Sequence, residues 1–198
     1  MSEENIYSSL VSEGALHRVA CVNWKEYPYS PQVDFNIARS DRYLAVLFHV
    51  TEDHVRATAM EPNGPVWEDS CVETFITAPD GKEYFNFEVN CIGTVLASRR
   101  KSRTEAEHFG PELMSQIRCF GSLPHEVIDS EREGQKWWRC ILIPLHLTGH
   151  ESWPESLRAN FYKCRDKCRQ PHFLSWSEID LPAPDFHCPE FFGELRIY

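Results

Sequence analysis

Several sequence signals of common protein classes are missing from this chain of 198 residues. No stretch approaches the roughly 20 apolar residues that a transmembrane helix needs. The N-terminal residues MSEENIYSSL have neither the basic nor the apolar region of a secretory signal, so we expect a cytoplasmic protein, with a trimmed form of an exported protein as the alternative. The chain also has no G-x-S-x-G, H-E-x-x-H or phosphate-loop motif, and therefore no signature of those catalytic classes.

Positive charge is scarce as well. The chain has 20 Lys and Arg against 30 Asp and Glu, a formal net charge of −10. Nucleic acids and anionic membranes reward basic surfaces, so we expect neither as a partner. The one basic cluster comprises Arg99, Arg100, Lys101 and Arg103, and we interpret it as a solvated loop. The negative net charge does not disfavour a neutral glycan as a partner. The sequence does not indicate the oligomeric state.

The eight cysteines lack the C-x-x-C spacing that is typical of zinc fingers. Most stand singly in apolar runs such as SCVETFI and RCILIPL, which predicts buried, reduced thiols. The alternative is a zinc site built on Cys164-x3-Cys168-x3-His172, with His187 and Cys188 downstream. Because that spacing matches no common zinc motif, we predict no metal ligand from it.

Helical patterns are rare, and short strands dominate the expected secondary structure. Residues 33–39 alternate apolar and polar side chains, and residues 43–50 form an almost continuous apolar run, as in a strand buried on both faces. Further strands are expected at 72–78, 84–91, about 115–121, 137–144, 159–165 and 193–198, the last pairing with an early strand. Short helices or turns are expected at 102–109 and 153–158.

The length and the strand pattern together favour one all-β domain over residues 1–198. All-β domains often reach this size, and a folded chain of this length buries roughly 70% of its extended surface, so a sizeable core is possible. Thirteen prolines and frequent short strands favour a sandwich over a doubly wound α/β fold. Two carboxylates, Glu73 and Glu88, fall in the middle of strands, where they either face solvent or line a concave site.

Three ordered segments resemble carbohydrate-binding module family 9 and the broader DOMON-like sandwiches. VWEDSCVETFI is similar to the W-x2-D-S-x-V-E-x-F motif of that family, YFNFEVNCIGT to its Y-x-F-x-V-N-x-x-G stretch, and LSWSEIDLPAPDFHCPEFFGELRI to its closing segment. The resemblance implies an all-β fold, a two-sheet antiparallel sandwich related to the jelly roll, with one or two short helices. It also implies non-catalytic binding of a sugar-chain end between two aromatic faces, linked to polysaccharide catabolism.

The resemblance assigns a set of candidate sugar-binding residues. Trp67 corresponds to an aromatic stacking platform, its alternative being a lid on the core, and Glu73 to a carboxylate that binds sugar hydroxyls. Phe186 stands where the family has its second stacking tryptophan, and Glu88 where founding members have an arginine. The remaining candidates are Asn90, on the strand of Glu88, and Lys163 and Arg165, which we expect to compensate the two acids.

Two other functions and one metal are left open. Glu73 and Glu88 are residues of the type that hydrolyses glycosides when two carboxylates face each other across a cleft. Some DOMON-like sandwiches hold haem through a Met and a His; this chain has Met60, Met114 and nine histidines, but no C-x-x-C-H motif. Family members often carry structural calcium. No EF-hand spacing is present, although carbonyl groups with Asp69 or Asp80 would suit the ion.

Overall fold

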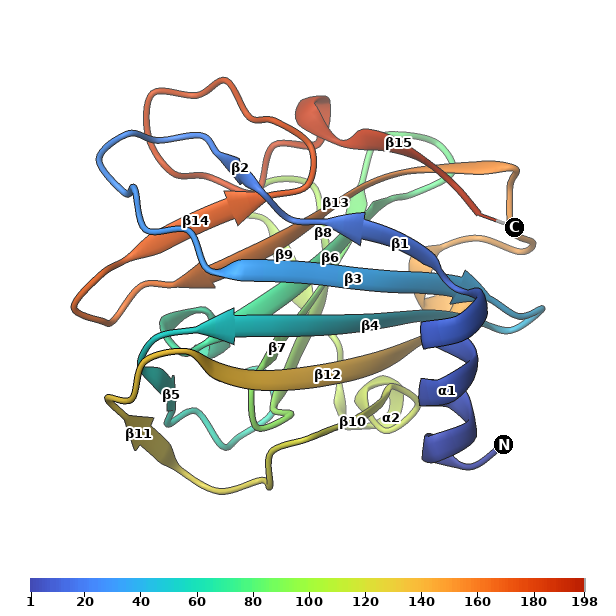
Figure 1. The fold of residues 1–198 in the computed structure, drawn as a ribbon. Helices are drawn as coiled ribbons and strands as arrows, with labels where there is room; N and C mark the ends of the chain where they lie inside the picture. Colours follow the sequence, from blue (N-terminus) through green and yellow to red (C-terminus); the bar gives the residue numbers. More distant parts are fainter. Residues whose placement is uncertain (198) are drawn as a thin grey trace.

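Two antiparallel sheets packed face to face form the body of this computed structural model, which describes residues 1–197 (Figure 1). The front sheet has five strands in the order β1 (Ala15–Arg18), β3 (Gln32–Arg39), β4 (Tyr43–Glu52), β12 (Gln135–Pro144) and β10 (Arg118–Gly121). The eight-stranded rear sheet runs β2 (Cys21–Val22), β14 (His172–Ser175), β13 (Ser156–Arg165), β6 (Cys71–Thr77), β7 (Tyr84–Asn90), β8 (Val95–Arg100) and β9 (Ala106–His108), with β15 (Gly193–Arg196) also paired to β13.

Small elements close the ends of the sandwich. Strands β5 (Val55–Ala57) and β11 (Ile128–Ser130) form a separate two-stranded sheet. The short helices are α2 (Pro111–Met114), η1 (Val66–Glu68), η2 (Leu145–Thr148) and η3 (Pro189–Phe191), the last three being 3₁₀ turns. Within the described residues, no helix has both the length and the apolar character to cross a membrane.

The main core lies between the two sheets, where alternation along each strand sends every second side chain inward. Phe35 of β3 stacks on Phe161 of β13, with ring centroids 4.2 Å apart, and so joins the two layers. Val72 and Ile76 of β6, and Phe87 of β7, enter the same core. These are the faces that the sequence pattern predicts, and the all-β sandwich is confirmed.

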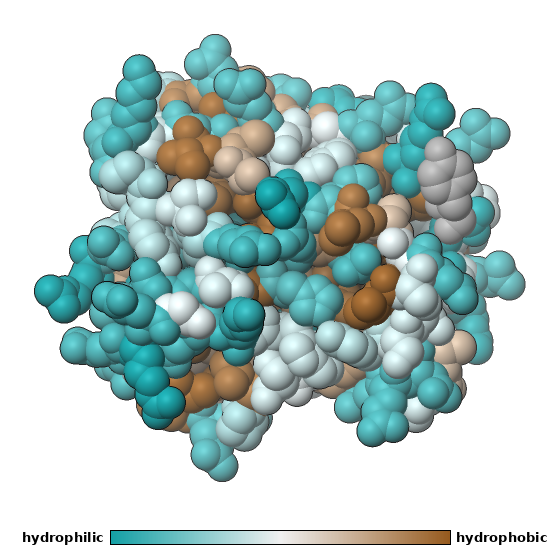
Figure 2. Space-filling view, in the orientation of Figure 1, coloured by the Kyte–Doolittle hydropathy of each residue, from teal (hydrophilic) through white to brown (hydrophobic). Residues whose placement is uncertain are grey.

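Helix α1 (Glu3–Glu13) covers the outer face of the five-stranded sheet (Figure 1). Its N-terminus is capped by Ser2, whose hydroxyl accepts a hydrogen bond from the amide of Asn5. Leu10 packs on Leu47 of β4 and Phe120 of β10. Figure 2 shows this side of the molecule as mostly hydrophilic, with separate hydrophobic patches. The helix therefore explains why the apolar run of β4 is buried on both faces.

Several local expectations are wrong. Residues 102–109 contain strand β9 and residues 156–158 begin strand β13, whereas the helices are α1 and α2. The closing strand β15 pairs with β13 and not with an early strand, and residue 198 of the expected strand lies outside the described residues. The expected strand at 115–121 begins at Arg118, because α2 and its following turn occupy the residues before it.

A second apolar cluster lies on the outer face of the eight-stranded sheet. Phe75 of β6, Tyr84 of β7 and Tyr162 of β13 form its base. Residues 176–192, here called the covering segment, pack over that base through Ile179, Phe186 and other side chains. The outer face of this sheet is therefore covered along part of its length, and the uncovered part forms the pocket described next.

Candidate functional site

A pocket of about 500 Å³ opens on the outer face of the eight-stranded sheet. Strands β6, β7, β8 and β13 contribute residues to it, as do η1, the chain beyond β8 and the covering segment. The lining residues are Tyr27, Trp67, Glu73, Glu88, Arg100, Arg103, Cys164, Asp166, Phe173, Pro184, Asp185, Phe186 and His187. Of the seven predicted site residues, four therefore meet in one pocket, and Asn90, Lys163 and Arg165 do not line it.

Trp67 presents its indole at the edge of the pocket. It lies in η1, which begins directly after Pro65, and at 39% exposure it is the most exposed of the six tryptophans, all of which are within the described residues. Backbone hydrogen bonds from Asp166 to the carbonyl of Trp67 (3.2 Å) and from Lys167 to that of Glu68 (3.3 Å) hold η1 against the end of β13. The indole is therefore on a fixed turn and open to a ligand.

A buried carboxylate, Asp69, fixes the loop in front of this turn. Asp69 accepts hydrogen bonds from the amides of Thr58 (3.0 Å) and Ala59 (2.9 Å) and from the side-chain amide of Asn90 (3.0 Å), and it pairs with Arg56 (2.9 Å). Asn90, predicted to bind sugar, is fully buried, and its side-chain amide is already hydrogen-bonded to Asp69. Since N–H donors occupy the oxygens of Asp69, that carboxylate is not arranged as the calcium ligand considered above.

Two buried carboxylates form part of the pocket floor. Glu73 of β6 and Glu88 of β7 are directly opposite in the strand register, and each is only 3% exposed. Glu73 accepts a hydrogen bond from the Cys164 thiol (3.1 Å) and Glu88 one from the Asn86 amide (2.8 Å). Burial raises the pKa of Glu73 well above its ordinary value, with Cys164 and Glu88 adding to the shift. Burial likewise raises the pKa of Glu88 to about 7, partly offset by Asn86 and Arg100.

The second aromatic wall is mostly hidden. Phe186 is 9% exposed and stacks on Tyr162, with ring centroids 4.1 Å apart and an angle of 9° between the rings. The Tyr162 hydroxyl donates to the carbonyl of Phe186 (3.1 Å), which fixes this part of the covering segment. Tyr27 and Phe173, which sequence reasoning missed, contribute further aromatic surface.

The expected compensation of the two acids by Lys163 and Arg165 is not observed. Side chains alternate along β13, so that Tyr162 and Cys164 lie on the outer face of the sheet, where Cys164 lines the pocket, whereas Lys163 and Arg165 face the other sheet. Lys163 is fully buried and forms an ion pair with Glu52 of β4, at 2.9 Å. Arg165 is 1% exposed and stands opposite His172 of β14.

Positive charge reaches the pocket from the basic cluster instead. Arg100 is 8% exposed, which contradicts its interpretation as part of a solvated loop. Its guanidinium donates to the side chains of Asn86 and Ser98 (3.0 Å each) and to the carbonyl of Arg103 (2.8 Å). Arg103 lies 3.6 Å from Asp185 of the covering segment. Recognising 95–100 as a strand beside β7 would have revealed Arg100.

The zinc ligands suggested by spacing do not converge. Cys168 donates its thiol hydrogen to the carbonyl of Arg165 (3.3 Å), whereas His172 contacts the Lys163 ammonium (3.0 Å) between the sheets. All eight cysteines are free thiols, in agreement with the prediction that they are reduced; five are buried and three half-buried. The potential metal ligands that do gather within residues 1–197 are Cys71, Glu73 and Cys164.

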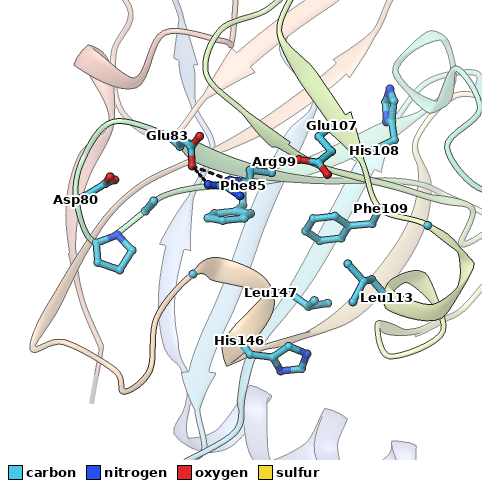
Figure 3. A pocket seen from close by; sticks show the side chains of 14 residues that line it. Asp80, Glu83, Phe85, Arg99, Glu107, His108, Phe109, Leu113, His146 and Leu147 are labelled. Carbon is cyan, nitrogen blue, oxygen red and sulfur yellow. Dashed lines mark hydrogen bonds and ion pairs between the residues drawn. The ribbon is translucent and has the colours of Figure 1, made fainter.

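A larger pocket, of about 650 Å³, lies elsewhere on the molecule (Figure 3). Phe85, Phe109, Leu113 and Leu147 gather at its centre, and the Glu83–Arg99 ion pair lies beside them. Phe85 and Phe109 are each only 7% exposed, and of the three carboxylates that line this pocket, Asp80, Glu83 and Glu107, Glu83 is already paired with Arg99. The smaller pocket combines an exposed indole with buried carboxylates, and it is therefore the stronger candidate for ligand binding.

Comparisons with known proteins agree with this fold. The sequence matches the model of carbohydrate-binding family 9 over residues 9–197, whereas no curated protein matches it. A candidate carbohydrate-binding protein from Bacteroides uniformis ATCC 8492 is similar in structure, with a TM-score of 0.94 and 36% sequence identity over 100% of this chain and 93% of that one.

Two solved structures of a family 9 module from Caldicellulosiruptor kristjanssonii are also similar, each at 12% identity. The complex with cellotriose has a TM-score of 0.59 (98% of this chain, 85% of that one), and the complex with glucose 0.56 (93% and 84%). At this identity the likeness shows the shared fold. The family match over nearly the whole chain and the 36% identical relative show that the chain belongs to carbohydrate-binding family 9.

Proposed function

We propose that this family 9 module holds the end of a saccharide in the pocket beside Trp67 and does not cut it. The proposal rests on one observation: an exposed indole and two buried carboxylates, Glu73 and Glu88, line the same pocket of about 500 Å³. That volume lies within the range of small-molecule sites, which combine apolar surface with a few placed polar groups.

The chemistry of these groups suits a pyranose ring. One face of the ring carries C–H groups that pack on an indole, and its rim carries hydroxyls that both donate and accept hydrogen bonds. A protonated carboxyl also does both, whereas an ionised one only accepts. Because burial raises the pKa of Glu73 well above its ordinary value, the protonated form of Glu73 is favoured, and that form offers a donor as well as an acceptor. Arg100 and Arg103 add donors at the rim of the pocket.

The aromatic surface predicts a modest affinity. Trp67 is 39% exposed but Phe186 only 9%, so that one wall offers much more stacking area than the other. A single sugar ring also has few atoms to bind. We expect dissociation constants on the order of micromolar to millimolar. The module from Caldicellulosiruptor kristjanssonii was solved with glucose and cellotriose, which makes glucose-terminated chains the first ligands to test and a role in polysaccharide catabolism the natural setting.

Calorimetric titration with glucose, cellobiose and cellotriose tests this proposal. Trp67→Ala should weaken binding at least tenfold, which corresponds to about 1.4 kcal/mol. Trp153→Ala is the matched control, since that half-buried indole donates to the carbonyl of Ser40 and lies outside the pocket. If none of a wider panel of saccharides binds at millimolar concentration, or if Trp67→Ala binds as well as wild type, the proposal is wrong.

Glycoside hydrolysis is the alternative that one observation favours. Glu73 and Glu88 are directly opposite on neighbouring strands and line the same pocket, and retaining glycosidases hold two carboxyl groups close together, about 5–5.5 Å apart. Product release from nitrophenyl glycosides separates the two functions. A binding module releases no product, whereas a hydrolase would release nitrophenol and lose that activity in Glu73→Gln.

A further inference from the structure

Three potential metal ligands meet in the floor of the pocket, beneath the proposed sugar position. Cys71 of β6 and Cys164 of β13 are directly opposite in the strand register, and Glu73 follows two residues after Cys71 on the same face. One donor atom from each residue lies within 4.8 Å of the other two, and the Cys164 thiol is 3.1 Å from the carboxyl of Glu73. All three side chains are buried.

Glu88 provides a second, independent sign of a missing ligand at this place. It stands opposite Glu73 and lines the pocket while being 97% buried, since only 3% of it is exposed. Its Oε1 accepts from Asn86, but its buried Oε2 has no hydrogen-bond partner within the described residues. A buried oxygen without a partner costs roughly 1–3 kcal/mol, which a bound cation or its water ligand would recover.

We propose that Cys71, Glu73 and Cys164 form a binding site for one thiophilic divalent cation, of which Zn²⁺ is the best match. Two thiolates and a carboxylate are common Zn²⁺ ligands, with bonds of about 2.3 Å to sulfur and 2.0–2.2 Å to oxygen. Tetrahedral coordination at those lengths puts neighbouring ligand atoms roughly 3.5–3.8 Å apart, within the spread of the three donors here. Mg²⁺ and Ca²⁺ prefer oxygen ligands and would not select this set.

The pocket supplies the way in and the fourth ligand. Cys164 and Glu73 both line it, so that an ion reaches the cluster without disturbing the sandwich core. The fourth position is then taken by water, to which the unpartnered oxygen of Glu88 offers a hydrogen-bond acceptor. The binding step is an exchange of protons for the metal: the thiols and the carboxyl release their protons, and the cation binds the resulting anions. This site does not depend on the proposed function, because the metal alone is its ligand.

Cobalt titration of the full chain tests the site. Metal-free protein, kept reduced with a phosphine, is titrated with Co²⁺ and then with Zn²⁺. We expect one equivalent of Co²⁺ to give thiolate-to-cobalt charge-transfer absorption and the intense visible bands of tetrahedral cobalt, and one equivalent of Zn²⁺ to remove both. Cys71→Ser and Cys164→Ser should each weaken Co²⁺ binding by a factor on the order of 100 or more, because each replaces a thiolate by a poor ligand.

Two further variants keep the result decisive. Cys168→Ser is the matched control, since that thiol lies outside the cluster and should bind Co²⁺ as wild type does. If the cysteine variants fail to fold by circular dichroism, the nearly isosteric Glu73→Gln should still change the visible bands and weaken binding. Absence of a stoichiometric thiolate–cobalt spectrum in the reduced wild type overturns the proposal, as does an equal loss in Cys168→Ser or an unchanged spectrum in Glu73→Gln.

Discussion

At the scale of single residues, His187 makes the stability of the fold depend on pH. Its Nδ1 is hydrogen-bonded to the Tyr84 hydroxyl (3.0 Å), and burial, together with Arg100 and Arg103, lowers its pKa from 6.5 to about 3. The folded state therefore holds this imidazole neutral, whereas the unfolded chain protonates it below pH 6.5. The stabilisation is present above pH 6.5 and is lost as the pH falls toward 3.

Urea unfolding at pH 7 and pH 5 measures this contribution. His187→Gln keeps a hydrogen-bond acceptor but cannot bind the proton. Between pH 7 and pH 5, the wild type should lose on the order of 2 kcal/mol more unfolding free energy than the variant. This magnitude follows because pH 5 lies about 1.5 pH units below the unfolded-state pKa of 6.5, and each unit is worth about 1.4 kcal/mol. Parallel losses in the two proteins would show that His187 does not titrate in this way.

At the scale of elements, Asn160 of β13 fixes the start of the covering segment. Its side-chain amide donates to the carbonyl of Ser177 (3.1 Å), and its oxygen accepts from the amides of Ser177 (2.9 Å) and Phe161 (3.0 Å). Asn160→Ala should cost about 1–3 kcal/mol, since buried backbone groups lose their partners. The loss should also loosen the segment that carries Phe186, and so weaken saccharide binding.

Hydrogen exchange localises that effect. Amides of residues 177–187 should exchange faster in Asn160→Ala, while those of β3 and β4 keep the wild-type rate. Asn36→Ala is the control: Asn36 lies on β3 of the other sheet, its buried amide donates to the carbonyl of Gly14 at the end of α1, and its loss should leave the covering segment unchanged. A uniform increase across the whole chain would indicate general destabilisation and contradict the assigned role of Asn160.

Strands with strong periodicity were predictable from sequence, and weakly patterned elements were not. The expected strands at 33–39 and 72–78 agree with β3 and β6 within one residue at each end. Helix α1 buries only Leu10 fully, so its sequence carries little amphipathic signal. Strand β8 ends in Arg99 and Arg100, whose charges predict a surface loop. The guanidinium of Arg100 donates to Asn86 and Ser98, and the local sequence does not reveal these contacts.

The candidate site was predictable only where a motif fixed it. Trp67 and Glu73 belong to one contiguous motif and do lie in the same pocket. Lys163 and Arg165 were expected there because the two acids, Glu73 and Glu88, call for compensating positive charge. Their orientation depends on the pairing of β13 with β6, in which Lys163 stands opposite the core residue Val72. Register between two strands that lie 91 residues apart in the sequence is a tertiary property that alternation within one strand does not determine.

At the scale of the whole molecule, the Glu52–Lys163 ion pair connects the two sheets. Both side chains are buried, and Glu52 also accepts a hydrogen bond from the indole of Trp137 (2.8 Å). Removing one partner leaves a buried, uncompensated charge. Lys163→Met should therefore lower the unfolding free energy by about 3–5 kcal/mol, and Glu52→Gln in the same chain should restore part of that loss.

Saccharide binding distinguishes this structural role from a role at the pocket. Under conditions where Lys163→Met remains folded, its saccharide affinity should stay within about twofold of wild type, because the ammonium points between the sheets and away from the pocket. Arg18→Ala, which removes the exposed partner of Asp34, is the matched ion-pair control and should cost under about 1 kcal/mol. A Lys163→Met variant with wild-type stability and lost saccharide binding would instead put this lysine at the ligand, and would require β13 to present its other face.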